Sequence, residues 1–184
     1  MSDASPPSPH YKRILLKLSG EALMGEQTYG IDPAIATRIA QDVAEIQSLG
    51  VQTAIVILPD VRGLYHFYKE LALRFAEVGV EAVAIDYFGR TAGMTARDDQ
   101  FEYMPHVMQT QADSIADDVA AAVAWLRRPE GSQPSAIFTV GFCFGGRNSF
   151  LQATRQHGLA GVIGFYGSPG AGRSAPTPTE LAGD

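Results

Sequence analysis

The sequence predicts an α/β protein, a three-layer sandwich in which helices cover both faces of a mostly parallel sheet. Two observations lead to this fold class. Short apolar or β-branched runs alternate with segments of helical periodicity, and short glycine or proline turns separate them. With 184 residues, 46% of them hydrophobic, the chain can also bury one substantial core, so we expect a single folded unit.

Five segments have the composition of buried strands. Each is a short apolar or β-branched run, and glycine, proline or polar residues punctuate the stretches between them. They are residues 14–18, 53–58, 82–87, 136–140 and 161–166. Strands that alternate with helices in this way favour parallel pairing, because each crossover helix returns the chain to the same edge of the sheet.

Four segments have the periodicity of amphipathic helices. The first lies between Asp32, which suits an N-cap, and Gly50, which suits the helix end. The other three are residues 65–79, 112–128 and 146–157. We expect the remaining segments to be irregular: a disordered lead-in at 1–10, a long surface loop at 88–111 and a flexible tail at 171–184.

Composition excludes several classes of function. Fourteen basic and twenty acidic residues give a net charge of −6 without a Lys/Arg cluster, so no nucleic-acid partner is expected. One cysteine cannot form an internal disulfide, and no apolar run is long enough to be a signal peptide or a membrane span. We therefore expect a cytoplasmic protein without a membrane partner. The four histidines lack ligand spacing, so neither a metal site nor a cofactor is expected.

The single cysteine, Cys143, lies in TVGFCFGGR between a predicted strand and a predicted helix. Gly141 and Gly145 flank it with the spacing of a nucleophile elbow, a tight strand-to-helix turn with no room for side chains at the two glycines. The start of the following helix favours a thiolate, and the N–H of Phe144 is placed to stabilise an oxyanion. The alternative is a buried structural cysteine.

Four stretches resemble the dienelactone hydrolase family, a branch of the α/β-hydrolases with a cysteine nucleophile. They are VILPDVRGLYHFY, VEAVAIDYFGRTAG, FTVGFCFGGRNSF and GLAGVIGFYGSPG. They lie within residues 53–170, in the family's order and with roughly its spacing. The resemblance implies an incomplete α/β-hydrolase-like fold and the hydrolysis of a small carboxylic ester or lactone.

The same resemblance implies roles for individual residues. Cys143 matches the nucleophile, and the N–H groups of Val61 and Phe144 match the oxyanion hole. Asp60 takes the place of a family glutamate that contacts the thiol, and Arg90 matches an arginine that helps to bind the substrate carboxylate. From the residues alone, Asp60 could equally be a turn residue after a strand and Arg90 a solvated surface arginine.

The family's triad also contains an Asp and a His, which follow two later strands beyond the position of Gly170. This chain shows no such strands, so we expect impaired hydrolysis. His66 and His106 lie in loops on the strand-end side, and His157 lies roughly 20 Å along the helix from the elbow. Each of the three is expected to be a surface or half-buried histidine.

Residues 11–52 resemble a different family. YKRILLKLSGEALMG and YGIDPAIATRIAQDVAEIQSLGVQTAIVI are similar to the N-terminus of bacterial uridylate kinase. That resemblance implies that Lys17, Ser19 and Gly20 contact nucleotide phosphates, and the alternative is an ordinary strand–turn connection with a snorkelling lysine.

The two resemblances meet near residues 53–57, so the chain looks like a chimera. Three functions remain open: an impaired hydrolase, a nucleotide-binding fragment and a non-catalytic chimeric protein. With the later hydrolase strands absent, we expect residues 161–166 to form an exposed sheet edge that promotes self-association.

Overall fold

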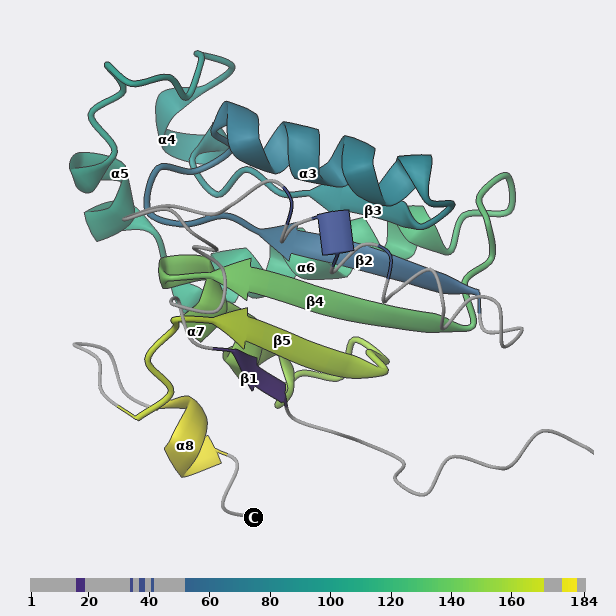
Figure 1. Cartoon of the computed structure of the whole chain (residues 1–184). Helices are drawn as coiled ribbons and strands as arrows, with labels where there is room; N and C mark the ends of the chain where they lie inside the picture. Colours follow the sequence, from purple (N-terminus) through teal and green to yellow (C-terminus); the bar gives the residue numbers. More distant parts are fainter. Residues whose placement is uncertain are drawn as a thin grey trace, which may run out of the picture.

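The computed structural model describes residues 52–170 and 177–181, the strand at 16–18, and helical residues 34, 37, 38 and 41. Five strands form one sheet in the order β1-β5-β4-β2-β3, and every neighbouring pair is parallel (Figure 1). The α/β class and the parallel sheet predicted from the sequence are therefore confirmed.

The strands run over Leu16–Leu18 (β1), Thr53–Leu58 (β2), Glu81–Ala84 (β3), Ala136–Phe142 (β4) and Gly161–Phe165 (β5). β2 is buried along its whole length. Its register with β4 pairs Leu58 with Gly141, and β4 in turn pairs Gly141 with Gly164 of β5. The carboxyl ends of β2, β4 and β5 therefore lie side by side, which is where ligands bind in open parallel sheets.

The helices run over His66–Glu77 (α3), Gly89–Ala92 (α4), Met104–Gln109 (α5), Ala112–Leu126 (α6), Phe144–Gln152 (α7) and Pro178–Leu181 (α8). Two cores lie on opposite faces of β2, because successive side chains of a strand point to opposite faces. Ile55 and Ile57 pack under Tyr68 and Phe75 of α3. Ala54, Val56 and Leu58 pack under α6. Figure 1 shows these two layers, so the sandwich is confirmed.

Two segments expected to be irregular contain helices. α4 and α5 lie within 88–111, and α8 lies within the tail. In α8, the Glu180 carboxylate accepts from the Thr177 N–H (2.7 Å) and the Thr177 hydroxyl accepts from the Glu180 N–H (3.2 Å). This reciprocal pair is a capping box, and its sequence signal, Thr-x-x-Glu, was present in the chain. The helix predicted at 146–157 is α7 in the structure, and it begins and ends earlier, at Phe144 and Gln152.

The strand at 161–166 is not a sheet edge. β1 covers β5, with Leu16 paired to Ile163 and Leu18 to Phe165, so the edges of the described sheet are β1 and β3. The expectation of an exposed edge there is wrong because the N-terminal strand fills that position. Residues 1–10 and both ends of the helix predicted after Asp32 lie outside the described residues. No helix in the described ranges is long and apolar enough to cross a membrane.

Candidate active site

Cys143 stands at the turn between β4 and α7, with φ 52° and ψ −111°. Positive φ is uncommon for a residue other than glycine, and such strained positions cluster at functional sites. Two backbone hydrogen bonds hold the turn: the Cys143 N–H donates to the Phe165 carbonyl (2.9 Å), and the Cys143 carbonyl accepts from the Arg147 N–H (3.1 Å). The strand–turn–helix context predicted for Cys143 is therefore present.

The two glycines that flank Cys143 are required by close backbone approaches. A Cβ on Gly141 would lie 2.0 Å from the Gly145 carbonyl oxygen. A Cβ on Gly145 would lie 2.1 Å from the carbonyl oxygen of Leu58 and 2.2 Å from that of Pro59. The start of α7 thus packs directly on the backbone that leads from β2 into Asp60. No side chain separates the elbow from this loop.

Asp60 is buried at the beginning of that loop. Its carboxylate accepts hydrogen bonds from the backbone N–H of Arg62 (2.8 Å) and from the Arg62 guanidinium, with Nη2 at 2.7 Å. The Asp60 carbonyl also accepts from the Gly63 N–H (3.1 Å). Asp60 is therefore a turn residue, which is one of the two interpretations of the sequence. Its contact with the thiol stays a prediction.

The pKa of the Cys143 thiol is raised above its usual value, chiefly because the side chain is half-buried. The Phe144 N–H lowers this pKa, the Asp60 carboxylate raises it, and the Arg62 guanidinium lowers it. The helix start therefore acts in the direction expected from the sequence. Burial outweighs it, so the net effect of the surroundings disfavours the thiolate although the helix start favours it.

The two N–H groups predicted for an oxyanion hole belong to the residues after Asp60 and after Cys143. Among the described residues, neither the Val61 N–H nor the Phe144 N–H donates to a backbone or side-chain oxygen. Two such donors beside a nucleophile are what an oxyanion hole requires. Their joint action on a substrate stays a prediction.

Tyrosines that sequence reasoning did not select surround this turn. Tyr87 is buried and donates to the Pro59 carbonyl (2.7 Å), which anchors the Asp60 loop. Tyr166 has φ 41°, and burial, then Asp60 and Cys143, raise its pKa to about 12. Each tyrosine is the last residue of a predicted strand, at the edge where ligands bind in open parallel sheets. That position in the sequence is a signal that could have identified them.

Arg62 was also overlooked, although it lies two residues beyond Asp60. Its guanidinium sits 4.4 Å from the centre of the Tyr65 ring, and its side chain is 44% exposed. The hydrogen bonds that Arg62 donates to Asp60 raise the pKa of Arg62 further above its already high value, so Arg62 is always charged. The Tyr65 hydroxyl donates to Asp99 (2.5 Å), which ties this loop to the segment after β3.

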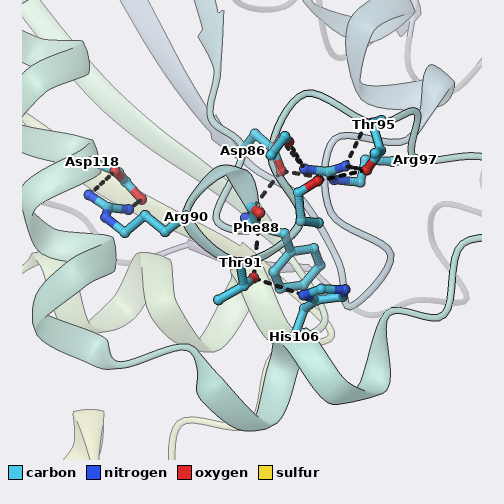
Figure 2. A network of polar contacts seen from close by, with 10 residues as sticks. Asp86, Phe88, Arg90, Thr91, Thr95, Arg97, His106 and Asp118 are labelled. Atoms are coloured by element: carbon cyan, nitrogen blue, oxygen red, sulfur yellow. Dashed lines mark hydrogen bonds and ion pairs between the residues drawn. The ribbon is translucent and has the colours of Figure 1, made fainter.

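Arg90 lies on α4 and forms an ion pair with Asp118 of α6 (2.7 Å). Figure 2 shows this pair directed away from the network of Asp86, Arg97, Thr91 and His106. Half of the Arg90 side chain is exposed, which agrees with its reading as a surface arginine. Its role in binding a substrate carboxylate stays a prediction.

The three histidines expected to be surface or half-buried groups contact residues other than Cys143. His106 pairs with the Thr91 hydroxyl (2.8 Å, Figure 2), and His157 pairs with Gln152 (3.0 Å). His66 is exposed and lies against the Tyr65 ring. Within residues 52–170, no histidine hydrogen-bonds to Cys143, and no cluster suited to a metal ion occurs in the described ranges. Ser19, Gly20 and the Lys17 side chain lie outside the described residues.

Comparison with known proteins gives two kinds of relative. A family model described as the dienelactone hydrolase family matches residues 39–182. The uridylate kinase of Vibrio campbellii is 46% identical over 96 residues, covering 50% of this chain and 37% of the kinase. That of Bartonella bacilliformis is 48% identical over 82 residues, covering 45% of this chain and 31% of the kinase. The chain thus spans about a third of the length of these relatives.

The kinase match is longer than the part of the chain outside residues 39–182, so the two similarities overlap. Among solved structures, a candidate dienelactone hydrolase from Klebsiella pneumoniae subsp. pneumoniae superimposes with a TM-score of 0.59 at 21% identity. The similarity covers 72% of this chain and 56% of that one, and at this identity it shows the fold alone. The family match spans most of the sequence, from before β2 to beyond β5. This chain, which also carries similarity to uridylate kinases, therefore belongs to the dienelactone hydrolase family.

Proposed function

We propose that the site around Cys143 is that of a hydrolase for small carboxylic esters or lactones, and that its hydrolysis is impaired in this chain. The observation that carries the proposal is the position of Cys143: a strained residue at a strand–helix turn, where the N–H of Phe144 lowers the pKa of the thiol. A buried structural cysteine needs neither the backbone strain nor a helix start directed at its thiol. Family membership supports the same chemistry.

The reaction begins when the Cys143 thiolate attacks the substrate carbonyl. A bond forms between sulfur and carbon, the carbonyl π electrons move to the oxygen, and the N–H groups of Val61 and Phe144 stabilise the resulting oxyanion. When the carbonyl re-forms, the C–O bond breaks and the alkoxide takes up the proton that the thiol first gave to a nearby base. The alcohol leaves when the substrate is an ester and stays attached to the acyl group when it is a lactone. The product is an acyl-thioester on Cys143. Asp60, whose charge raises the pKa of the thiol, is the nearby carboxylate that can receive this proton.

Release of the acyl group by water is the step that we propose is impaired. An efficient site needs a base within hydrogen-bond reach and a third group that orients it. In the part of the chain that the structure describes, each histidine is engaged elsewhere or faces solvent, and none contacts the thiol. We therefore expect acylation to outpace deacylation, so that the acyl-enzyme accumulates.

The test is intact-protein mass spectrometry after incubation with 4-nitrophenyl acetate, for the chain and for Cys143→Ala. We expect one acetyl group on the chain, none on Cys143→Ala, and a burst of nitrophenol without sustained turnover. Circular dichroism of both proteins controls for folding. An unmodified chain, or acetylation that persists in Cys143→Ala, would falsify the proposal.

A second candidate function is nucleotide binding, which the similarity to uridylate kinases favours. Ligand that binds only the folded chain raises its melting temperature. ATP or UMP that raises the melting temperature, together with an unreactive Cys143, would replace the hydrolase proposal with this one.

A further inference from the structure

We propose that Tyr166 is a catalytic residue whose hydroxyl donates a hydrogen bond, and then its proton, to the leaving oxygen of the substrate. This inference rests on the proposed function and deepens it by naming a substrate class: esters and lactones of aliphatic alcohols. An aliphatic alkoxide is a strong base, so a donor that protonates it as the C–O bond breaks lowers the barrier. The family resemblance assigns no role to Tyr166.

The backbone on both sides of Tyr166 is attached to the cysteine turn. The preceding residue, Phe165, accepts a hydrogen bond from the Cys143 N–H (2.9 Å). The following residue, Gly167, packs so closely on the start of α7 that a Cβ there would lie 2.3 Å from the Arg147 nitrogen. Tyr166 is therefore fixed beside Cys143 by two contacts that its own side chain does not make.

Tyr166 has a left-handed backbone conformation, with φ 41°. Within the described part of the chain, the other residues with positive φ, glycines excepted, are Gln133 and Cys143. This region is unfavourable for a bulky side chain, and residues held there cluster at functional sites. The strand end thus carries a strained tyrosine next to the strained cysteine that we propose as the nucleophile.

The Tyr166 hydroxyl is available to a ligand. The residue is 40% exposed, although its ring packs against Phe142 with the ring centres 6.3 Å apart. Among the residues that the structure describes, the hydroxyl donates to no acceptor. The side chain is therefore supported by the core at its ring and open at its polar end, which is the arrangement that a proton donor needs.

The Tyr166 hydroxyl also interacts with the charged groups of the site. Partial burial, then the charges of Asp60 and Cys143, raise the pKa of Tyr166 to about 12, and the Arg62 guanidinium lowers it. Tyr166 is therefore protonated at neutral pH. Because this pKa is still below that of an ordinary aliphatic alcohol, transfer of the proton to an aliphatic alkoxide is favourable.

A second tyrosine hydroxyl lies in the same group of side chains. Tyr68 of α3 is fully buried, and with the described residues its hydroxyl makes no hydrogen bond of ordinary geometry. Burial, then Asp60 and Tyr166, raise its pKa, so these three side chains interact. An unpaired buried hydroxyl costs free energy and calls for an explanation. Here it provides a group that can relay a proton between Asp60 and Tyr166.

The tetrahedral intermediate shows why a donor is needed. A thiolate leaves more easily than an alkoxide, so without a donor the intermediate returns to the ester and Cys143. With Tyr166, the C–O bond breaks, its electron pair stays on oxygen and the Tyr166 proton passes to that oxygen. The phenolate then takes up, through Tyr68, the proton that the thiol gave to Asp60. The thiol proton is thus balanced by the proton on the alcohol.

The experiment compares two esters that form the same acetyl-enzyme but release oxygens of different basicity. Trifluoroethyl acetate releases a strongly basic aliphatic alkoxide, whereas 4-nitrophenyl acetate releases a weakly basic phenoxide that leaves without a proton. We measure the rate of acetylation of Cys143 by intact mass for the unaltered chain, Tyr166→Phe and Tyr103→Phe. Tyr103 is the matched control, since it is half-buried and packs on the core beneath α6.

We expect Tyr166→Phe to slow acetylation by trifluoroethyl acetate at least tenfold and to change that by 4-nitrophenyl acetate less than twofold. Tyr103→Phe should change neither rate. Equal effects of Tyr166→Phe on both esters, or no effect on either, would overturn the inference and leave the hydrolase standing. Acetylation by 4-nitrophenyl acetate alone in the unaltered chain would do the same.

A measurement without a variant tests the same point if Tyr166→Phe does not fold. The ratio of the rates with trifluoroethyl and 4-nitrophenyl acetate should be at least tenfold higher for the unaltered chain than for N-acetylcysteine, a thiol without a donor. Equal ratios would contradict the role of Tyr166. If neither ester acetylates Cys143, the proposed hydrolase is wrong and this inference is wrong with it.

Discussion

The loops that follow β2 and β3 each contain an arginine that pairs with an aspartate, yet the two arginines differ in their exposure and in how many of their N–H donors the protein uses. After β3, Arg97 is 2% exposed, bonds to Asp86 at 2.8 Å and uses all of its donors within the protein (Figure 2). After β2, Arg62 is 44% exposed and bonds to Asp60 at 2.7 Å, and its Nη1 donates to no acceptor among the described residues. The Arg97–Asp86 pair thus stabilises its loop from inside the protein, whereas the Arg62–Asp60 pair leaves a charged guanidinium at the surface.

Residue type alone therefore does not distinguish a structural arginine from one that is open to a ligand. A buried guanidinium must satisfy its donors internally because desolvation of an unpaired charge is costly. Arg97 therefore donates its hydrogen bonds to Asp86, Thr95 and Gly93 of the segment after β3 rather than to solvent. Arg62 has water, or a ligand, as its remaining partner.

The largest effect is expected from replacing the buried arginine. Arg97→Gln leaves Asp86 without its charged partner and removes hydrogen bonds to Thr95 and Gly93, so the free energy of unfolding should fall by about 3 kcal/mol. Arg62→Gln should cost about 1 kcal/mol, because its ion pair is partly solvated. Urea denaturation of both variants measures the difference. Equal losses would show that the two loops do not differ as described.

A second comparison places one methyl group in each region. Gly145→Ala forces a Cβ against the carbonyl groups of Leu58 and Pro59 and should lower the free energy of unfolding by about 2 kcal/mol. Gly89→Ala, on α4, meets nothing within 4 Å and should be neutral or stabilising by up to about 1 kcal/mol. Thermal unfolding followed by circular dichroism distinguishes the two. A tolerated Gly145→Ala would contradict the close packing of the elbow on the Asp60 loop.

The smallest expected change is in a titration rather than in stability. The Asp60 carboxylate raises the pKa of the Cys143 thiol, so its removal in Asp60→Asn should lower that pKa. Alkylation by iodoacetamide as a function of pH should then shift to lower pH and become faster at neutral pH. Glu130→Gln, which removes an exposed carboxylate elsewhere, should leave the profile in place. A shift to higher pH would mean that Asp60 stabilises the thiolate.

Much of the fold and part of the site follow from local sequence. The strand at 53–58 was predicted with its observed bounds, because a β-branched run stopped by proline has few alternatives. The glycine spacing around Cys143 identified the turn, since only glycine tolerates approaches of 2.0–2.1 Å to backbone. The helices within 88–111 could not be predicted in this way, because contacts such as Arg97 with Asp86 stabilise that segment from a distance.

By itself, therefore, the sequence determined the alternation of strands and helices and the position of a strained cysteine at a strand end, because steric and periodic constraints act between neighbours along the chain. Only the tertiary structure decided which charges meet. It paired Arg90 with Asp118, enclosed Arg97, left Arg62 open beside Cys143, and placed the N-terminal strand on β5. Burial and charge pairing depend on residues far apart in the chain, and burial is what raised the pKa of the thiol.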